Sequence, residues 1–297
     1  MTTQHIEGSA GTIYSRPSYE SIDVGAQMRL GHPDVAEGDR IILDMLMEMS
    51  RTAEGPLRIL ELGSGSGYLV EMIRRQIPNA RLVANEVEPA LVKLARERFA
   101  GTDVRVFDGD FEDWTEPLDV LISWGAHHHF SSRTHLDHAR RLLGRDGKLI
   151  LGDEFCPDYL ETSDRARLAA AELIYLAQGH LLTTHAEVDA FEKTGDLPAW
   201  TVALEKRRRG ALWHWYKYVV DYALERDDDV VIQAELQIAA DDLRTEFAGE
   251  HKIALPIVVR ELELNGFREL QRHSLRAEPD LASFFVLELG VDPRSVA

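Results

Sequence analysis

The chain has very little cysteine and few basic residues for its length. Of its 297 residues only Cys156 is a cysteine, which excludes a disulfide framework and any zinc site with two cysteine ligands. The 33 Lys and Arg residues are outnumbered by 51 Asp and Glu residues, so the formal net charge is −18. Such a chain repels the phosphate backbone of DNA and RNA, and we therefore expect no nucleic-acid partner.

Long apolar runs are also missing. No stretch approaches the roughly 20 apolar residues that cross a bilayer, and residues 1–17 lack the basic start and apolar core of a secretory signal. We therefore expect a cytoplasmic protein with no membrane partner. Hydrophobic residues still make up 44% of the chain and charged residues 28%, as in ordinary globular proteins, and the length suggests about two domains.

Strand and helix patterns alternate through the first half of the chain. Residues 38–51 repeat apolar positions at helical spacing and predict an amphipathic helix. Five short apolar runs then alternate with helical patterns, and we expect strands at 57–62, 80–85, 104–107, 118–124 and 148–152. This alternation predicts a parallel sheet with helices on both faces.

The alternation stops after the fifth strand and returns near the end of the chain. Residues 157–249 are helical by pattern, with helices at 165–182 and 200–224 and no expected strand. Strands are expected again at 267–273 and 284–289. A helical block of roughly 90 residues therefore interrupts an α/β domain late in its sheet.

A glycine-rich loop follows the first expected strand. Residues 61–67 read Glu-Leu-Gly-Ser-Gly-Ser-Gly and lead into a helix. Glycines allow a sharp turn and a close approach of ligand to backbone, and the helix start presents N–H groups. The Gly-x-Gly-x-Gly spacing differs from the Gly-x-Gly-x-x-Gly of dinucleotide sites, and the Lys-Ser/Thr pair of a phosphate loop is missing. A dinucleotide or nucleoside triphosphate site is therefore disfavoured.

Residues 61–67 resemble motif I of the class I S-adenosylmethionine-dependent methyltransferases, and further residues follow at the spacing of that family. Glu86 ends the second strand, and matching segments follow at 108–111, 123–128 and 141–149. The resemblance covers about residues 57–153 and 251–289. It implies an α/β fold: a Rossmann-like, mostly parallel seven-stranded sheet with helices on both faces and a helical cap inserted after strand five. The expected domains are a lid segment at 1–37, the sheet domain at 38–156 with 250–297, and the cap at 157–249.

The resemblance also implies the methyl donor, S-adenosyl-L-methionine, with S-adenosyl-L-homocysteine as product. In that family the acid that ends the second strand binds the ribose hydroxyls, and the residues after the third strand contact adenine. A carboxylate suits two hydroxyl donors because charged acceptors make the stronger hydrogen bonds. The implied donor-binding residues are Glu61, Gly63, Ser64, Gly65, Gly67, Glu86, Asp110, Phe111 and Trp124.

Histidines and an acid follow the fourth and fifth strands, where a parallel sheet of this kind binds its ligands. His127 and His128 follow strand four and Asp153 follows strand five, and these three are the candidate catalytic residues. The histidines could shape the loop, serve as a base near neutral pH, or ligate a metal. Asp153 and Glu154 could equally cap the next helix. The candidate ligands of a divalent or ferric ion are His128, Asp153 and His180.

The helical block and the N-terminal segment are expected to cover the acceptor and exclude water. Residues 213–218 are rich in aromatics, which could line an acceptor pocket or pack between helices. Residues 207–209 are three arginines, which form a solvated turn or attract a carboxylate. Three residues of the N-terminal segment could cover the donor: Tyr14, Tyr19 and Met28.

These features predict a methyltransferase that acts on a small-molecule metabolite by in-line transfer to an O, N or C atom. We place it in specialised metabolism such as antibiotic biosynthesis. One alternative is metal-assisted C-methylation of a 2-oxo acid, because the histidine run looks similar to metal-assisted 2-oxo acid methyltransferases of antibiotic pathways. Others are a non-catalytic S-adenosyl ligand-binding protein and a protein methyltransferase with an open acidic groove. An apolar helical lid would also favour a homodimer.

Overall fold

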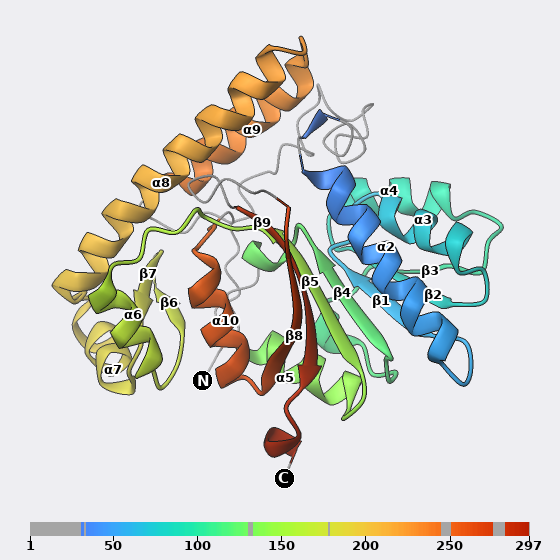
Figure 1. Cartoon of the computed structure of the whole chain (residues 1–297), viewed down its shortest axis with the longest axis horizontal. Coiled ribbons are helices and arrows are strands. Elements are labelled where there is room, and N and C mark those ends of the chain that lie inside the picture. The colour runs from blue at the N-terminus through green and yellow to red at the C-terminus, as the bar shows by residue number, and fades with distance from the viewer. Residues whose placement is uncertain are drawn as a thin grey trace.

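A seven-stranded sheet forms the centre of the computed structural model, which describes residues 31–32, 34–129, 133–177, 179–244, 251–275 and 283–296. The strand order is β3-β2-β1-β4-β5-β9-β8 (Figure 1). The first five strands run parallel. Only β9 is reversed: it pairs antiparallel with both β5 and β8, so β8 runs in the direction of the first five strands, which confirms the predicted mostly parallel sheet. The strands are β1 (Arg58–Leu62), β2 (Arg81–Asn85), β3 (Arg105–Phe107), β4 (Val120–Trp124), β5 (Lys148–Glu154), β8 (Phe267–Ser274) and β9 (Phe284–Val291).

Helices cover both faces of this sheet, as the sequence predicts (Figure 1). One face carries α2 (Val35–Thr52), α3 (Tyr68–Gln76) and α4 (Pro89–Arg98), and the other carries α5 (Arg133–Leu143) and α10 (Leu255–Leu264). The chain places β2 and β3 on one side of β1 and β4 and β5 on the other. Ligands of such sheets bind outside the carboxyl ends of the strands at this point of reversal.

The insertion after β5 contains a β-hairpin as well as helices. Its elements are α6 (Thr162–Ala169), β6 (Tyr175–Ala177), β7 (His180–Leu182), α7 (His185–Thr194), α8 (Ala199–Leu224) and α9 (Asp229–Asp242). The predicted insertion is confirmed, but the predicted helix over 165–182 and the predicted absence of strands are wrong. Gly179, with φ of +76°, reverses the chain, and the Glu172 N–H then donates to the Thr183 carbonyl. The apolar residues on both sides of this turn recur at helical spacing, so the sequence pattern predicted a continuous helix.

The insertion packs against both faces of the sheet domain at its carboxyl end. Trp215 and Val231, from α8 and α9, belong to the same apolar core as Ile42 of α2. Leu168 and Leu181, from α6 and β7, belong to the core beneath α10. The insertion therefore surrounds the ends of β4 and β5 rather than standing apart from the sheet.

Part of the predicted lid lies outside the described residues, including Tyr14, Tyr19 and Met28. Of the expected segment 1–37, the structure describes only the residues from 31 onward, with residue 33 left out. In the described part of the chain, no helix has both the length and the apolar character needed to cross a membrane.

Candidate active site

The glycine loop between β1 and α3 depends on three glycines in the left-handed region. Gly63, Gly65 and Gly67 have φ of +64°, +57° and +80°. A Cβ atom at Gly63 would lie 2.6 Å from the Cβ of Ala126, and one at Gly67 would lie 2.4 Å from the ring of Phe99. A Cβ at Gly65 would meet nothing within 4 Å. The outer glycines are therefore required by packing, whereas Gly65 leaves open space where a ligand can approach the backbone.

Glu86 fixes this loop from the end of the neighbouring strand. Its carboxylate is 8% exposed, and Oε2 accepts a hydrogen bond of 2.8 Å from the Gly65 N–H. Oε1 accepts from the N–H groups of Val87 at 2.8 Å and Glu88 at 2.9 Å. A carboxylate offers about four lone pairs, so Glu86 retains capacity for a ribose hydroxyl beside the loop. Open space at Gly65 next to this carboxylate fits an adenosyl ligand.

Two residues that the sequence reasoning missed also support the loop. The carbonyl of Asn85 accepts from the Ser64 N–H at 2.9 Å, and Arg98 donates to the Ser66 carbonyl at 2.8 Å. Neither residue belongs to the glycine motif. The position of Asn85 at the end of the second strand is the one sequence signal that could have identified it. The remaining predicted residues here are Glu61, buried in β1, Ser64, buried in the loop, and Asp110, exposed after β3.

Two predicted donor residues have their side chains in the core. Trp124 is 5% exposed, and its Nε1 donates to Asp39 of α2 at 2.8 Å. Phe111 is 3% exposed, and its ring centroid lies 4.9 Å from that of His135 and 5.1 Å from that of His138. Both aromatic rings therefore brace the strand ends, and donor binding by Phe111 and Trp124 stays a prediction.

His128 and Asp153 form a close pair at the ends of β4 and β5. His128 lies in the short 3-10 helix η3 (His127–His129), and its Nδ1 is 2.8 Å from Asp153 Oδ1. The His128 backbone N–H donates to Asp153 Oδ2 at 3.0 Å, and the Glu154 N–H donates to Oδ1 at 2.8 Å. Burial would raise the pKa of Asp153, but His128 holds this pKa below its usual value. An ionised Asp153 favours the His128 tautomer with the proton on Nδ1, which places the lone pair on Nε2.

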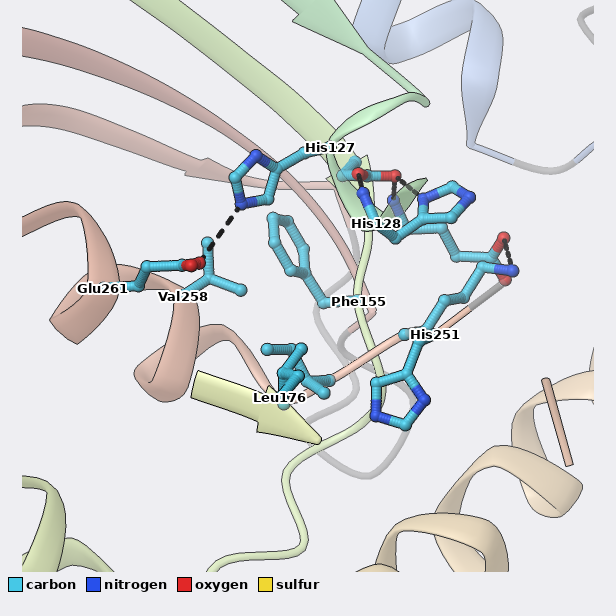
Figure 2. Close-up of a pocket in the computed structure, with 11 residues that line it drawn as sticks. His127, His128, Phe155, Leu176, His251, Val258 and Glu261 are labelled. Carbon is cyan, nitrogen blue, oxygen red and sulfur yellow. Dashed lines mark hydrogen bonds and ion pairs between the residues drawn. The ribbon is translucent and has the colours of Figure 1, made fainter. Parts of the chain in front are cut away.

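This pair lines a partly open pocket that five segments of the chain build together. Figure 2 shows His127 directed toward Glu261 of α10, and their Nε2 and Oε2 atoms are 3.7 Å apart. Besides three histidines, the lining has four apolar and four charged residues, and the charged residues come from β5, α10 and the segment before α10. The lining residues are His127, His128, Asp153, Glu154, Phe155, Leu176, His251, Lys252, Ile253, Val258 and Glu261.

His251 is the lining histidine that the candidate site did not include. It is 3% exposed, and burial, with the nearby charge of Arg208, lowers its pKa to about 3. Its imidazole is therefore neutral near pH 7. His180 is buried near His251, but within the described residues it forms no close group of ligand atoms with His128 and Asp153. Metal binding by those three residues stays a prediction.

A buried network of charges lies behind the pocket. Glu154 accepts a hydrogen bond from Trp215 Nε1, and its Oε2 is 3.5 Å from Lys252 Nζ. Burial raises the pKa of Glu154 to about 7, against the opposing effect of the Lys252 ammonium. Arg208 donates to Glu205 at 2.7 and 2.9 Å and to Asp242 at 2.7 Å. These contacts tie α8 and α9 to the end of β5.

The network settles two sequence interpretations. Arg208 is 1% exposed inside α8, so the solvated turn at 207–209 is wrong. Trp215 and Tyr216 are fully buried, so these two members of the aromatic run pack between helices, whereas Trp213 is 55% exposed. Arg208 lies in the same predicted helix as the aromatic run, and this combination could have indicated a buried ion pair.

Comparison with known proteins identifies the sheet domain. Residues 59–147 match the family described as "Methyltransferase domain". Malonyl-[acyl-carrier protein] O-methyltransferase of Paenibacillus sp. (strain JDR-2) is 28% identical over 106 residues, covering 31% of this chain and 37% of that protein. An rRNA adenine N-6-methyltransferase of Streptomyces fradiae is 37% identical over 75 residues, covering 24% and 23%. The chain thus spans well under half the length of these curated relatives.

A solved structure extends the likeness to the whole fold. The crystal structure of the CurJ carbon methyltransferase superposes with a TM-score of 0.50 at 15% identity, covering 91% of this chain and 58% of that one. The glycine loop and the buried acid at the end of β2 lie within the matched residues. The sheet domain, over residues 59–147, is therefore identified as a class I S-adenosylmethionine-dependent methyltransferase domain, whose methyl donor is S-adenosyl-L-methionine.

Proposed function

We propose that this chain transfers the donor's methyl group to a small-molecule acceptor held in the pocket between η3, β5 and α10, with His128 as the base. The observation that carries the proposal is the His128–Asp153 pair, 2.8 Å apart, at the carboxyl ends of two adjacent strands and in the wall of a pocket. Residues 157–249 form the cap of this pocket, because Leu176 of the hairpin contributes to its lining.

In this proposal the donor is held by residues at the ends of β1 and β2, and the acceptor by residues at the ends of β4 and β5. The bound donor supplies a methyl group on a sulfonium centre. Gly65 and Glu86 hold the adenosyl part, while His128 Nε2 takes a proton from the hydroxyl, amine or carbon acid of the acceptor. The Asp153 carboxylate orients the imidazole and stabilises the imidazolium that forms. Phe155 and Val258 keep water from the reacting atoms.

Burial and charge support a small acceptor over a macromolecule. Most lining residues are buried, with only His128 and Leu176 half-buried, and the chain carries a net charge of −18, which disfavours RNA. The attacked atom, a role in antibiotic biosynthesis and the 2-oxo acid alternative stay predictions. The predicted homodimer is checked by the mass of the protein in solution.

The test is an acceptor screen with the donor supplied at saturation. Phenols, amines, carboxylates and 2-oxo acids are each incubated with the protein, and S-adenosyl-L-homocysteine is measured by mass spectrometry. We expect turnover with one of these classes, and His128→Ala should lower the rate by roughly 10²- to 10⁴-fold. His214→Ala, an exposed histidine of α8 outside the pocket lining, is the matched control.

Two outcomes would overturn the proposal. A fully active His128→Ala variant would return the histidine run to a loop-shaping role. Tight donor binding without turnover on any acceptor class would instead support the non-catalytic alternative.

A further inference from the structure

Three potential metal ligands converge in the interior, apart from the His128–Asp153 pair. His32 precedes α2, Glu154 ends β5, and Glu235 lies in α9. One ligand atom from each residue lies within 4.8 Å of the other two. The three residues are 4%, 8% and 1% exposed, so all three are removed from bulk water.

The ligand types and their spacing fit a transition metal. An imidazole nitrogen with two carboxylate oxygens suits Mn²⁺, Fe²⁺ or Zn²⁺. His32 Nε2 and Glu235 Oε1 are 4.0 Å apart, which is too long for a hydrogen bond. Two ligands that each lie about 2.1 Å from one ion are separated by roughly 3 to 4 Å. The observed separation is therefore close to that of two ligands of a single ion.

Aromatic residues hold the ligands in this arrangement. The His32 ring contacts Phe284 edge-on, with centroids 4.8 Å apart, and lies 6.2 Å from the Trp215 ring. Trp215 Nε1 also donates a hydrogen bond to Glu154. One tryptophan thus positions two of the three ligands, as the supporting residues of metal sites commonly do.

The charge of the surrounding network favours a divalent cation. In the described part of the chain, four carboxylates meet in this interior: Glu154, Glu205, Glu235 and Asp242, each under 9% exposed. Two buried cations face them, Arg208 and Lys252. The cluster carries two surplus negative charges with Glu154 ionised and one with Glu154 protonated, and buried charges are normally paired or bound to metal.

We propose that His32, Glu154 and Glu235 bind one first-row divalent cation. The ion joins the segment before α2 and helix α9 of the cap to the end of β5. Because Glu154 also lines the acceptor pocket, the ion lies beside that pocket. The inference does not depend on which acceptor is methylated or on the role of His128.

Direct metal titration tests the site. Chelator-treated full-length protein is titrated with Mn²⁺ alone and with Zn²⁺ alone by calorimetry, and Tm is measured with and without each ion. We expect one ion per chain and a Tm rise of about 5 °C at a hundredfold excess over Kd. Glu235→Gln should bind at least tenfold more weakly and lose the Tm response. Glu225→Gln, which makes the same change at an exposed residue before α9, should keep both.

Several results would overturn the proposal. They are no binding to the wild-type chain, equal binding to Glu235→Gln, or loss of binding in His128→Ala with retention in Glu235→Gln. Affinity for S-adenosyl-L-homocysteine shows that Glu235→Gln is folded, and His32→Ala gives an independent second variant. Donor affinity and methyl transfer are measured separately, so a failed metal site leaves the proposed function intact.

Discussion

The proposed donor side and the proposed acceptor side of this molecule are built in different ways. On the donor side, Gly65 and Glu86 lie within one β-α-β unit, and backbone N–H groups meet a single carboxylate. On the acceptor side, the pocket draws residues from η3, β5, the hairpin of the insertion, the segment before α10 and α10 itself. A site formed by backbone groups requires glycine at fixed sequence positions. A site formed by side chains from distant segments has no local sequence pattern.

The two sides also differ in what stabilises them. The glycine loop is held by positive-φ glycines and neutral backbone groups around one acid. The wall behind the acceptor pocket is held by Arg208 and Lys252 in contact with buried carboxylates. Removing one partner of a buried ion pair leaves an uncompensated charge, so substitutions behind the acceptor pocket should cost more stability.

The largest effect should come from Arg208, at the centre of the buried network. Arg208→Ala leaves Glu205 and Asp242 without their guanidinium partner and should lower the free energy of unfolding by about 3–5 kcal/mol. Arg209→Ala, one residue along and 38% exposed at its side chain, should cost under about 1 kcal/mol. Urea unfolding measures both variants. Equal losses of unfolding free energy in the two variants would mean that the buried network does not stabilise the acceptor side.

The next effect separates the two sides by function. Asp153→Asn keeps the size of the side chain but loses the charge that fixes the His128 imidazole. We expect kcat to fall about 100-fold, equivalent to about 2.7 kcal/mol, with KM for the donor little changed. Steady-state kinetics on the acceptor found in the screen measure both values. A loss confined to KM would assign Asp153 to binding instead.

The smallest effect compares two glycines with similar backbone strain. Gly65 and Gly101 have φ of +57° and +75°, and an added Cβ meets nothing within 4 Å at either position. Gly65→Ala and Gly101→Ala should each lose about 1 kcal/mol of stability. Only Gly65→Ala should weaken binding of S-adenosyl-L-homocysteine, because only that methyl group enters the ligand's space. Equal affinities would remove Gly65 from the donor site.

Local patterns predicted the sheet and the glycine loop because each depends on residues close together in the sequence. Each of the five parallel strands, the glycine spacing and the place of Glu86 at a strand end can be recognised from a few neighbouring residues. The hairpin at Gly179 was missed because its flanking apolar residues also fit helical spacing. Burial of Arg208 depends on Asp242, which lies 34 residues away on another helix.

The remaining features of the site depend on contacts between residues that are far apart in the sequence. The predicted pair His128 and Asp153 does meet, because adjacent parallel strands end side by side. His251 and Glu261 joined them only through the packing of α10, and His32 approaches Glu235 only through the position of α9. No spacing along the chain encodes those contacts, so they required the fold.

A single comparison of donor affinities tests the central claim that the glycine loop and Glu86 hold the methyl donor. Calorimetric titration with S-adenosyl-L-homocysteine should show one site on the wild-type chain and binding weaker by about 1–3 kcal/mol in Glu86→Ala, through lost charged hydrogen bonds. Glu88→Ala, two residues away, should bind as the wild type does. Unchanged affinity in Glu86→Ala would contradict the assigned donor site.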